Sequence, residues 1–278
     1  MRVSAIVSRD FTIKSGISSF LRFQVQFLKV LFLRSNFYLS IYSRKPWVMR
    51  RTACLGNDVF DILESLPKRS INIQKGRIDL LTKSFHERLG IMRLYASRKL
   101  IERSDIRSLV IRQSISQLKK LNPPQLLIID SYSELTDQEF LLPNKAKFYC
   151  NYSDLFPGRD LPIQCNGLFD LDLLDDYYEA FILSVKERWG EGIPLIFLHF
   201  PEFKEPREKF RERSKMIRES AIRTSDKYLN FHFVELDEIE FWLLHKPTVD
   251  EFPYHYNFEV KKAIADKIEA ILLDTNRL

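Results

Sequence analysis

Continuous apolar runs mark the strands that the sequence predicts most clearly. The run Leu126–Asp130 is apolar until it ends in an acid, and Leu195–His199 is a second run of the same kind. A third short run, Val3–Val7, opens the chain. Strands without polar alternation are typical of parallel sheets that are covered on both faces. We therefore predict these three runs as neighbouring central strands of a mainly parallel sheet.

Segments with helical periodicity and weaker strand signals lie between these runs. The predicted helices are 16–34, two within 86–121, 134–142, 173–189, 204–224, 258–272, and a short one that Asn57 or Asp58 caps and that ends at Leu66. Weaker strands are predicted at 37–42, 146–150 and 231–235, a loop or hairpin at 67–84, and loops at 151–168 and 236–257. Strands that alternate with helices indicate βαβ units. We expect an α/β fold of three layers, with helices on both faces of a mostly parallel sheet, in a single domain over residues 1–278 with a helical insertion around 86–121.

The charge of the chain bears on its partners. Its 43 Lys and Arg residues outnumber 37 Asp and Glu residues, which gives a net charge of +6. This excess favours anionic partners such as nucleotide-linked sugars, acidic glycans or lipid head groups, although a solvated basic surface is the simpler explanation. No RNA-recognition, zinc-finger or helix-turn-helix signature is present, so nucleic acid is not an expected partner.

The cysteines and histidines suggest no metal site. Cys54, Cys150 and Cys165 have no CxxC spacing and form no even set, which predicts free thiols in a reducing compartment and therefore a cytoplasmic protein. The histidines lack the spacing of metal ligands. The sequence also contains no Walker A, dinucleotide-binding or HExxH motif, so we expect neither a metal nor a cofactor.

One apolar segment near the N-terminus raises the question of a membrane. The stretch Gly16–Leu33 is interrupted by Arg22, Gln24, Gln26 and Lys29, which a bilayer-spanning helix would not tolerate well. We expect an amphipathic helix that docks on the domain and no transmembrane segment. Peripheral membrane contact is the alternative, because apolar residues with interspersed cations also suit an interfacial helix.

Polar residues follow the predicted strands. In open parallel sheets, ligands bind beyond the carboxyl ends of the strands, near the point where the strand order reverses. This rule selects Ser8, Arg9 and Asp10, which follow the run Val3–Val7. It also selects Asp130, which ends the run that begins at Leu126, and Asn151, which follows the strand at 146–150. Guanidinium groups bind phosphates and carboxylates in bidentate fashion, which adds Arg9 and Arg44 as candidate anion ligands, with salt bridges as the simpler use.

The loop before the terminal helix carries the strongest candidate for chemistry. It reads Pro253-Tyr254-His255-Tyr256-Asn257, and Asp250 and Glu251 precede the histidine by five and four residues. This arrangement resembles the SGNH/GDSL hydrolases, in which a DxxH-like motif precedes the last helix. The segments Val7-Ser8-Arg9-Asp10, Tyr42-Ser43-Arg44 and Leu127-Ile128-Ile129-Asp130 are similar to a branch of SGNH-like proteins from bacterial surface-polysaccharide loci.

The resemblance implies a function and a set of roles. The fold would be of the SGNH-hydrolase or flavodoxin-like kind, and the protein an esterase or acyltransferase acting on an acyl group of a surface polysaccharide or its precursor. His255 would be the general base, oriented by Asp250 or Glu251. Ile6 stands at the position of the family's nucleophile, which leaves Ser8 as the nearest hydroxyl. The substrate-binding residues would be Arg9, Asp10, Arg44, Asp130 and Asn151.

Three interpretations therefore stay open. The first is an acyl-transfer enzyme that uses Ser8. The second is a catalytically degenerate binding or scaffold protein, which Ile6 favours. The third is a transferase that holds an anionic donor in the cleft without a covalent step. The segment Gly56-Asn57-Asp58 also resembles the family's GxND block in its letters, although no convincing strand is predicted before it.

Overall fold

The computed structural model describes residues 45–86, 113, 118, 121–141, 147–155, 163–246 and 255–275. All of them belong to one compact unit, residues 45–278. The strand predicted at Val3–Val7, the helix at 16–34, the strand at 37–42 and most of the helical insertion at 86–121 lie outside the described residues.

A parallel sheet forms the centre of this unit. Its five strands have the order β2-β1-β3-β7-β8, and every neighbouring pair is parallel. They are β1 Val48–Arg51, β2 Ser70–Asn72, β3 Leu126–Asp130, β7 Leu195–Leu198 and β8 Phe231–Val234. Renumbered among themselves, they follow the 2-1-3-4-5 order of doubly wound flavodoxin-like sheets. The predicted α/β class is confirmed, and the two strongest strand predictions, β3 and β7, are indeed neighbours.

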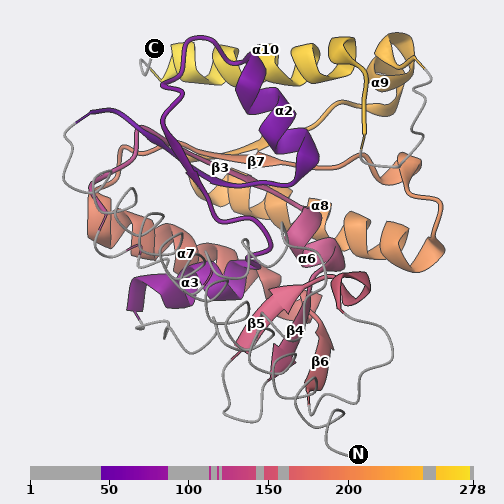
Figure 1. The fold of residues 1–278 in the computed structure, drawn as a ribbon. Helices are drawn as coiled ribbons and strands as arrows, with labels where there is room; N and C mark the ends of the chain where they lie inside the picture. The colour runs from indigo at the N-terminus through magenta and orange to yellow at the C-terminus, as the bar shows by residue number, and fades with distance from the viewer. Residues whose placement is uncertain are drawn as a thin grey trace, which may run out of the picture. The chain divides into compact units, whose positions relative to one another are not determined.

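Helices cover both faces of the parallel sheet (Figure 1). On one face lie α2, Cys54–Ile62, and α10, Phe258–Asp274, which pack against each other. The other face carries α3, Ile78–His86, α7, Leu174–Trp189, and α8, Glu208–Lys227. A short helix, α9, Glu238–Leu244, precedes α10. The three-layer arrangement explains why the residues of β3 and β7 are fully buried and why their sequences are continuously apolar.

A second, smaller sheet follows the third strand of the parallel sheet. The helix α6, Tyr132–Thr136, leads into an antiparallel sheet of order β5-β4-β6. Its strands are β4 Gln138–Leu141, β5 Lys147–Cys150 and β6 Gln164–Leu168. Short 3-10 helices at Tyr152–Asp154, Leu171–Leu173 and Glu202–Lys204 complete the elements. The stacked rings of Phe140 and Phe148, 5.3 Å apart, join β4 to β5 across the sheet.

Several predictions need correction. The segment 134–142 is not one helix, because α6 ends at Thr136 and the chain then pairs as β4. The expected loop at 67–84 contains β2 and α3, the loop at 151–168 contains β6, and the loop before the terminal helix contains α9. The short helix begins at Cys54 rather than at Asn57 or Asp58 and ends at Ile62. Beside β3 lies Val48–Arg51, which the pattern did not single out.

Candidate functional site

The strand order places a switch point between β1 and β3. These strands are neighbours, yet the chain leaves β1 toward the face of α2 and reaches β7 after β3 by way of α7 on the other face. Their carboxyl ends are therefore the position where doubly wound sheets bind ligands. The residues that follow are Thr52, Ala53 and Cys54 after β1, and Ser131 and Tyr132 after Asp130.

Asp130 joins the two strand ends. Its side chain is fully buried, and its carboxylate accepts a hydrogen bond from the Ala53 amide at 2.6 Å and from the Tyr132 amide at 3.2 Å. Burial raises the pKa of Asp130 to about 7, because the lost hydration outweighs the opposing effects of Arg51 and of the two amides. Asp130 therefore connects the residues that follow β1 to those that follow β3 at the switch point.

The first turn of α2 packs directly on Thr52 and Asp130. Gly56 leaves no room for a side chain, since a Cβ there would lie 2.5 Å from Thr52 Cβ and 3.3 Å from Asp130 Oδ2. A glycine lets the helix backbone approach the strand end this closely. The Gly56-Asn57-Asp58 segment thus does follow a strand, β1, although it lies within α2.

Amide side chains tie the ends of β1 and β2 to α2. Asn57 Oδ1 accepts hydrogen bonds from Arg50 Nη1 at 2.9 Å, Thr52 Oγ1 at 3.2 Å and Asn72 Nδ2 at 2.8 Å. Asn72 Oδ1 in turn accepts from the Thr52 amide at 3.2 Å. The hydroxyl of Thr52 is therefore engaged within the protein. The sequence did not predict these residues as part of the site, because β1 was not recognised as a strand. The segment Gly56-Asn57-Asp58 was the one signal in the sequence that pointed to them.

Cys54 places a thiol at the carboxyl edge of the parallel sheet. It is exposed and is the first residue of α2. The surrounding protein still removes part of the hydration of the thiol, which raises its pKa; the nearby carboxylates of Asp58 and Asp130 raise it further, and Lys75 opposes them. Because the thiolate is the nucleophilic form of cysteine, this environment does not activate the side chain.

Two buried groups of charges lie close to the switch point. Arg51 and Glu134 form a fully buried ion pair with 2.5 Å between Nη1 and Oε2. Lys75 Nζ lies 3.5 Å from Asp137 and 3.2 Å from Asp154. Burial alone would lower the pKa of Lys75, but these two carboxylates outweigh it and raise the pKa. Lys75 also has a φ of 63°, a left-handed conformation that is rare outside glycine and often occurs at functional positions.

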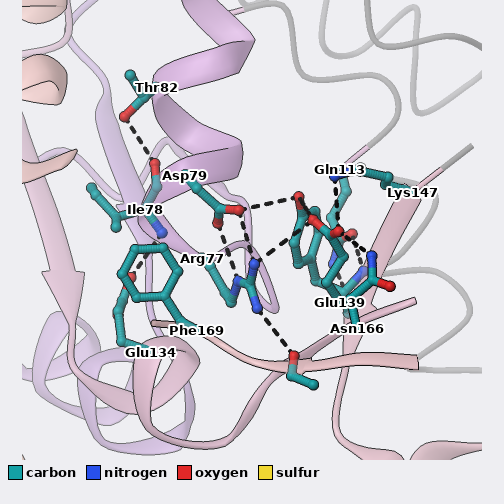
Figure 2. A network of polar contacts seen from close by, with 12 residues as sticks. Arg77, Ile78, Asp79, Thr82, Gln113, Glu134, Glu139, Lys147, Asn166 and Phe169 are labelled. Carbon is teal, nitrogen blue, oxygen red and sulfur yellow. Dashed lines mark hydrogen bonds and ion pairs between the residues drawn. The ribbon is translucent and has the colours of Figure 1, made fainter. Parts of the chain in front are cut away.

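A third group joins the small sheet to α3, as Figure 2 shows. Arg77 bonds Asp79 through both its Nε, at 3.1 Å, and its Nη2, at 2.9 Å. Its guanidinium lies over the rings of Tyr149 and Phe169, 4.7 and 5.2 Å from their centroids. Tyr149 Oη donates to Glu139 at 3.0 Å. We call Arg77, Asp79, Glu139 and Tyr149 the Arg77 cluster.

Glu139 within this cluster is held ionised. Burial acts to raise its pKa, but hydrogen bonds from Lys147, Asn166 and Tyr149 outweigh burial and lower the pKa to about 2. The distances are 2.8 Å for Lys147, 2.6 Å for Asn166 and 3.0 Å for Tyr149. Since every one of these contacts is internal, the cluster fastens two parts of the unit together.

His255 lies three residues before the start of α10, whose N-terminal end is beside that of α2. The ion pair between Lys261 Nζ and Asp58 Oδ2, at 2.6 Å, joins the two helices. Asp58 is the fifth residue of α2 and Lys261 the fourth of α10, so both helices begin about one turn before this contact. His255 is half-buried, and its neighbour Tyr256 packs on Phe241 at 5.3 Å. The histidine loop and the residues after β1 therefore share the carboxyl edge.

The structure separates the predicted site residues into three groups. Asp130 lies at the switch point and His255 at the same edge of the sheet. Asn151 follows a strand of the antiparallel sheet and caps the 3-10 helix Tyr152–Asp154, accepting from the Ser153 amide at 3.2 Å, so its oxygen has a local structural partner. The remaining candidates lie outside the described residues: Ser8, Arg9, Asp10, Arg44, Asp250 and Glu251.

Comparison with protein-family models, with curated proteins and with solved structures gave no significant match. Within the described ranges, no three His, Cys, Asp or Glu side chains are arranged to hold a metal ion. In the same part of the chain, no helix combines the length and the apolar character that crossing a bilayer requires.

Proposed function

We propose that this protein is an SGNH-like esterase or acyltransferase whose substrate carries an acyl group on a surface polysaccharide or its precursor. The observation that supports the proposal most is the place of His255. It stands just before the last helix of a doubly wound parallel sheet, at the edge where the N-terminal ends of α2 and α10 lie together. A general base in that position would lie at the edge of the sheet where substrates of such folds bind.

The proposed reaction is acyl transfer through a covalent ester. Ser8 Oγ attacks the acyl carbonyl carbon while His255 takes the hydroxyl proton, and His255 then gives that proton to the departing alcohol. An alcohol or water attacks the acyl-serine in the second half, with His255 again as the base. Asp250 or Glu251 orients the imidazole. Ser8, Asp250 and Glu251 belong to the proposal through the sequence resemblance alone.

The test is hydrolysis of an aryl acetate by the whole chain. Ser8→Ala and His255→Ala should each lower kcat by about a thousandfold or more, because nucleophile and base act as one unit. Both should leave the melting temperature nearly unchanged. Cys54→Ala is the matched control, since this thiol occupies the same edge in a protonated state, and it should retain activity.

Two results would contradict the mechanism. Turnover that survives Ser8→Ala would remove the proposed nucleophile, and loss of turnover in Cys54→Ala but not in Ser8→Ala would transfer that role to the cysteine. Trapping the acyl-enzyme with a radiolabelled acetyl ester and locating the label by peptide mapping distinguishes the two cases directly.

A second function, a binding protein without catalysis, is favoured by a specific observation. The Thr52 hydroxyl and the Asp130 carboxylate at the switch point are both engaged by internal hydrogen bonds, and the Cys54 thiol is not activated. The binding-protein hypothesis predicts that the wild type does not hydrolyse aryl esters. It also predicts that His255→Ala weakens binding of an acetylated glycan, measured by calorimetry.

A further inference from the structure

An exposed apolar stripe runs along α9. Ile239, Trp242 and Leu243 are 75%, 50% and 80% exposed. Their spacing of three and four residues places them on one side of the helix. Phe241 of the same helix is buried instead, with its ring 5.1 Å from Phe203 and 5.3 Å from Tyr256. Large apolar side chains that lie exposed together are typical of an interaction surface.

The two ends of this stripe carry opposite charge. Asp237 and Glu238, both exposed, lie at the N-terminal end of α9. At the C-terminal end, Lys246 is exposed and pairs with Glu259 of α10 at 3.2 Å, and Lys204 Nζ lies 3.4 Å from His245 Nε2. The surface is therefore negative at one end and apolar in the middle, and Lys204 makes the other end positive, since the charges of Lys246 and Glu259 offset each other.

We propose that the stripe is the contact surface of a homodimer in which α9 of two copies packs antiparallel about a two-fold axis. The positions Ile239, Trp242, Leu243 and Lys246 are symmetric about the midpoint between Trp242 and Leu243. In an antiparallel pair, Trp242 of one copy therefore meets Leu243 of the other. The acidic end of each helix then faces the basic end of its partner, so the charges are complementary.

Other arrangements fit these residues less well. Parallel packing of the two helices would bring like charges together at both ends, which disfavours association. An anionic membrane would attract the basic end but would be repelled by Asp237 and Glu238 at the other. The self-complementary dimer uses all three parts of the surface.

The size of the surface indicates how tight the dimer should be. A helix of seven residues is roughly 10 Å long. Phe258, which is 63% exposed at the start of α10, can enlarge the contact because Asn257 joins α10 to α9 through the Leu244 carbonyl at 2.9 Å. A contact built on so short a helix suits a weak, transient interface rather than an obligate one. We expect a reversible dimer whose population rises with protein concentration.

Sedimentation velocity over a range of protein concentrations tests the proposal. The wild type should shift from monomer to dimer as the concentration rises. Leu243→Glu places a charge in the centre of the interface and should raise the dimer dissociation constant by about tenfold or more. Leu229→Glu is the matched control, because Leu229 is 96% exposed but lies outside α9. It should dimerise as the wild type does, and the melting temperature of both variants should stay within a few degrees of the wild type.

Charge reversal tests the antiparallel arrangement. Glu238→Lys should weaken the dimer, and the double variant Glu238→Lys with Lys204→Glu should restore it, because each end then faces its opposite again. A double variant no tighter than Glu238→Lys alone would overturn that arrangement. A wild type that stays monomeric at every concentration, or a Leu243→Glu variant that dimerises normally, would overturn the dimer. Wild-type monomers that bind anionic phospholipid vesicles through Leu243 would assign the stripe to membranes instead.

Discussion

At the scale of the residue, buried charge is what defines the carboxyl edge. Asp130 accepts two backbone amides, and Glu134 neutralises Arg51 at 2.5 Å. A buried ion pair contributes little net stability, yet removing one partner leaves an uncompensated charge. These side chains therefore hold the strand ends in one geometry and confer specificity on the fold rather than a large gain in stability.

Asp130 should make the free energy of unfolding depend on pH. Its pKa is raised to about 7 from an ordinary value of 3.8, so between these values the folded protein holds a proton that the unfolded chain releases. The Asp130 contribution to stability is thus complete below about pH 4 and is lost as the pH rises to about 7. Asp130→Asn should remove this part of the slope.

Urea unfolding of wild type and Asp130→Asn at pH values from 5 to 8 measures the effect. The asparagine has a single oxygen for two amide donors, so the variant should be less stable by about 1–3 kcal/mol in the acidic range. The stability difference between the two proteins should shrink as the pH rises. A difference that stays constant with pH would show that another group carries the dependence.

At the scale of the element, α10 shows how an amphipathic helix is held on the sheet. Val260, Ile264, Ile268 and Leu272 recur at intervals of four residues and are all buried, whereas Leu273 of the same helix is 63% exposed. This periodicity predicted α10 correctly from the sequence. The buried side of the helix packs on α2 and β8.

Truncation of a buried side chain of α10 should cost far more than truncation of an exposed one. Ile268→Ala removes apolar contacts and leaves a cavity, so the free energy of unfolding should fall by about 2–5 kcal/mol. Leu273→Ala should change it by less than about 0.5 kcal/mol. Chemical denaturation of both variants measures the two values, and equal effects would contradict the packing of α10 on the sheet.

Elements that depend on local pattern could be predicted, and those that depend on distant partners could not. The apolar runs of β3 and β7 need no partner to be recognised. In β1, two consecutive arginines conceal a strand, because Arg51 is buried only through Glu134, 83 residues further along the chain. The strand β4 was concealed in the same way, since it exists by pairing with β5 and β6. By contrast, α9 carried a visible signal: Asp237 caps it by accepting from the Glu240 amide at 2.8 Å.

At the scale of the whole molecule, the Arg77 cluster connects the small antiparallel sheet to the parallel sheet and its helices. Arg77 reaches Asp79 in α3, the ring of Tyr149 in β5 and the Gly167 carbonyl in β6, the last at 3.4 Å. The candidate site could be predicted only to the level of the sheet edge. Asp130 and His255 were found from their places along the chain, but Ala53, one of the two amide partners of Asp130, follows β1, which was missed.

Removal of the Arg77 guanidinium should loosen the small sheet selectively. Arg77→Met keeps the apolar stem but leaves Asp79 and Glu139 buried without this cation, which should destabilise the unit by about 3–5 kcal/mol. Hydrogen exchange should accelerate more at the amides of β4 and β5 than at those of β3 and β7. Arg223→Met breaks an exposed pair with Asp175 and should leave both exchange rates unchanged. Uniform acceleration in both sheets would contradict a local role for the cluster.

The strand order also governs how the protein can assemble while the ribosome is still making it. Among the strands that the structure describes, β1 and β2 emerge first and can pair, β3 then adds beside β1, and β7 and β8 extend the same side in the order of their synthesis. The covering helix α10 comes last, yet its partner α2 is among the first elements made. The nascent chain must therefore leave the part of this face that α10 covers exposed until residues 258–274 have been made. We expect a holdase chaperone to engage it during that interval and to leave once residues 258–274 have docked.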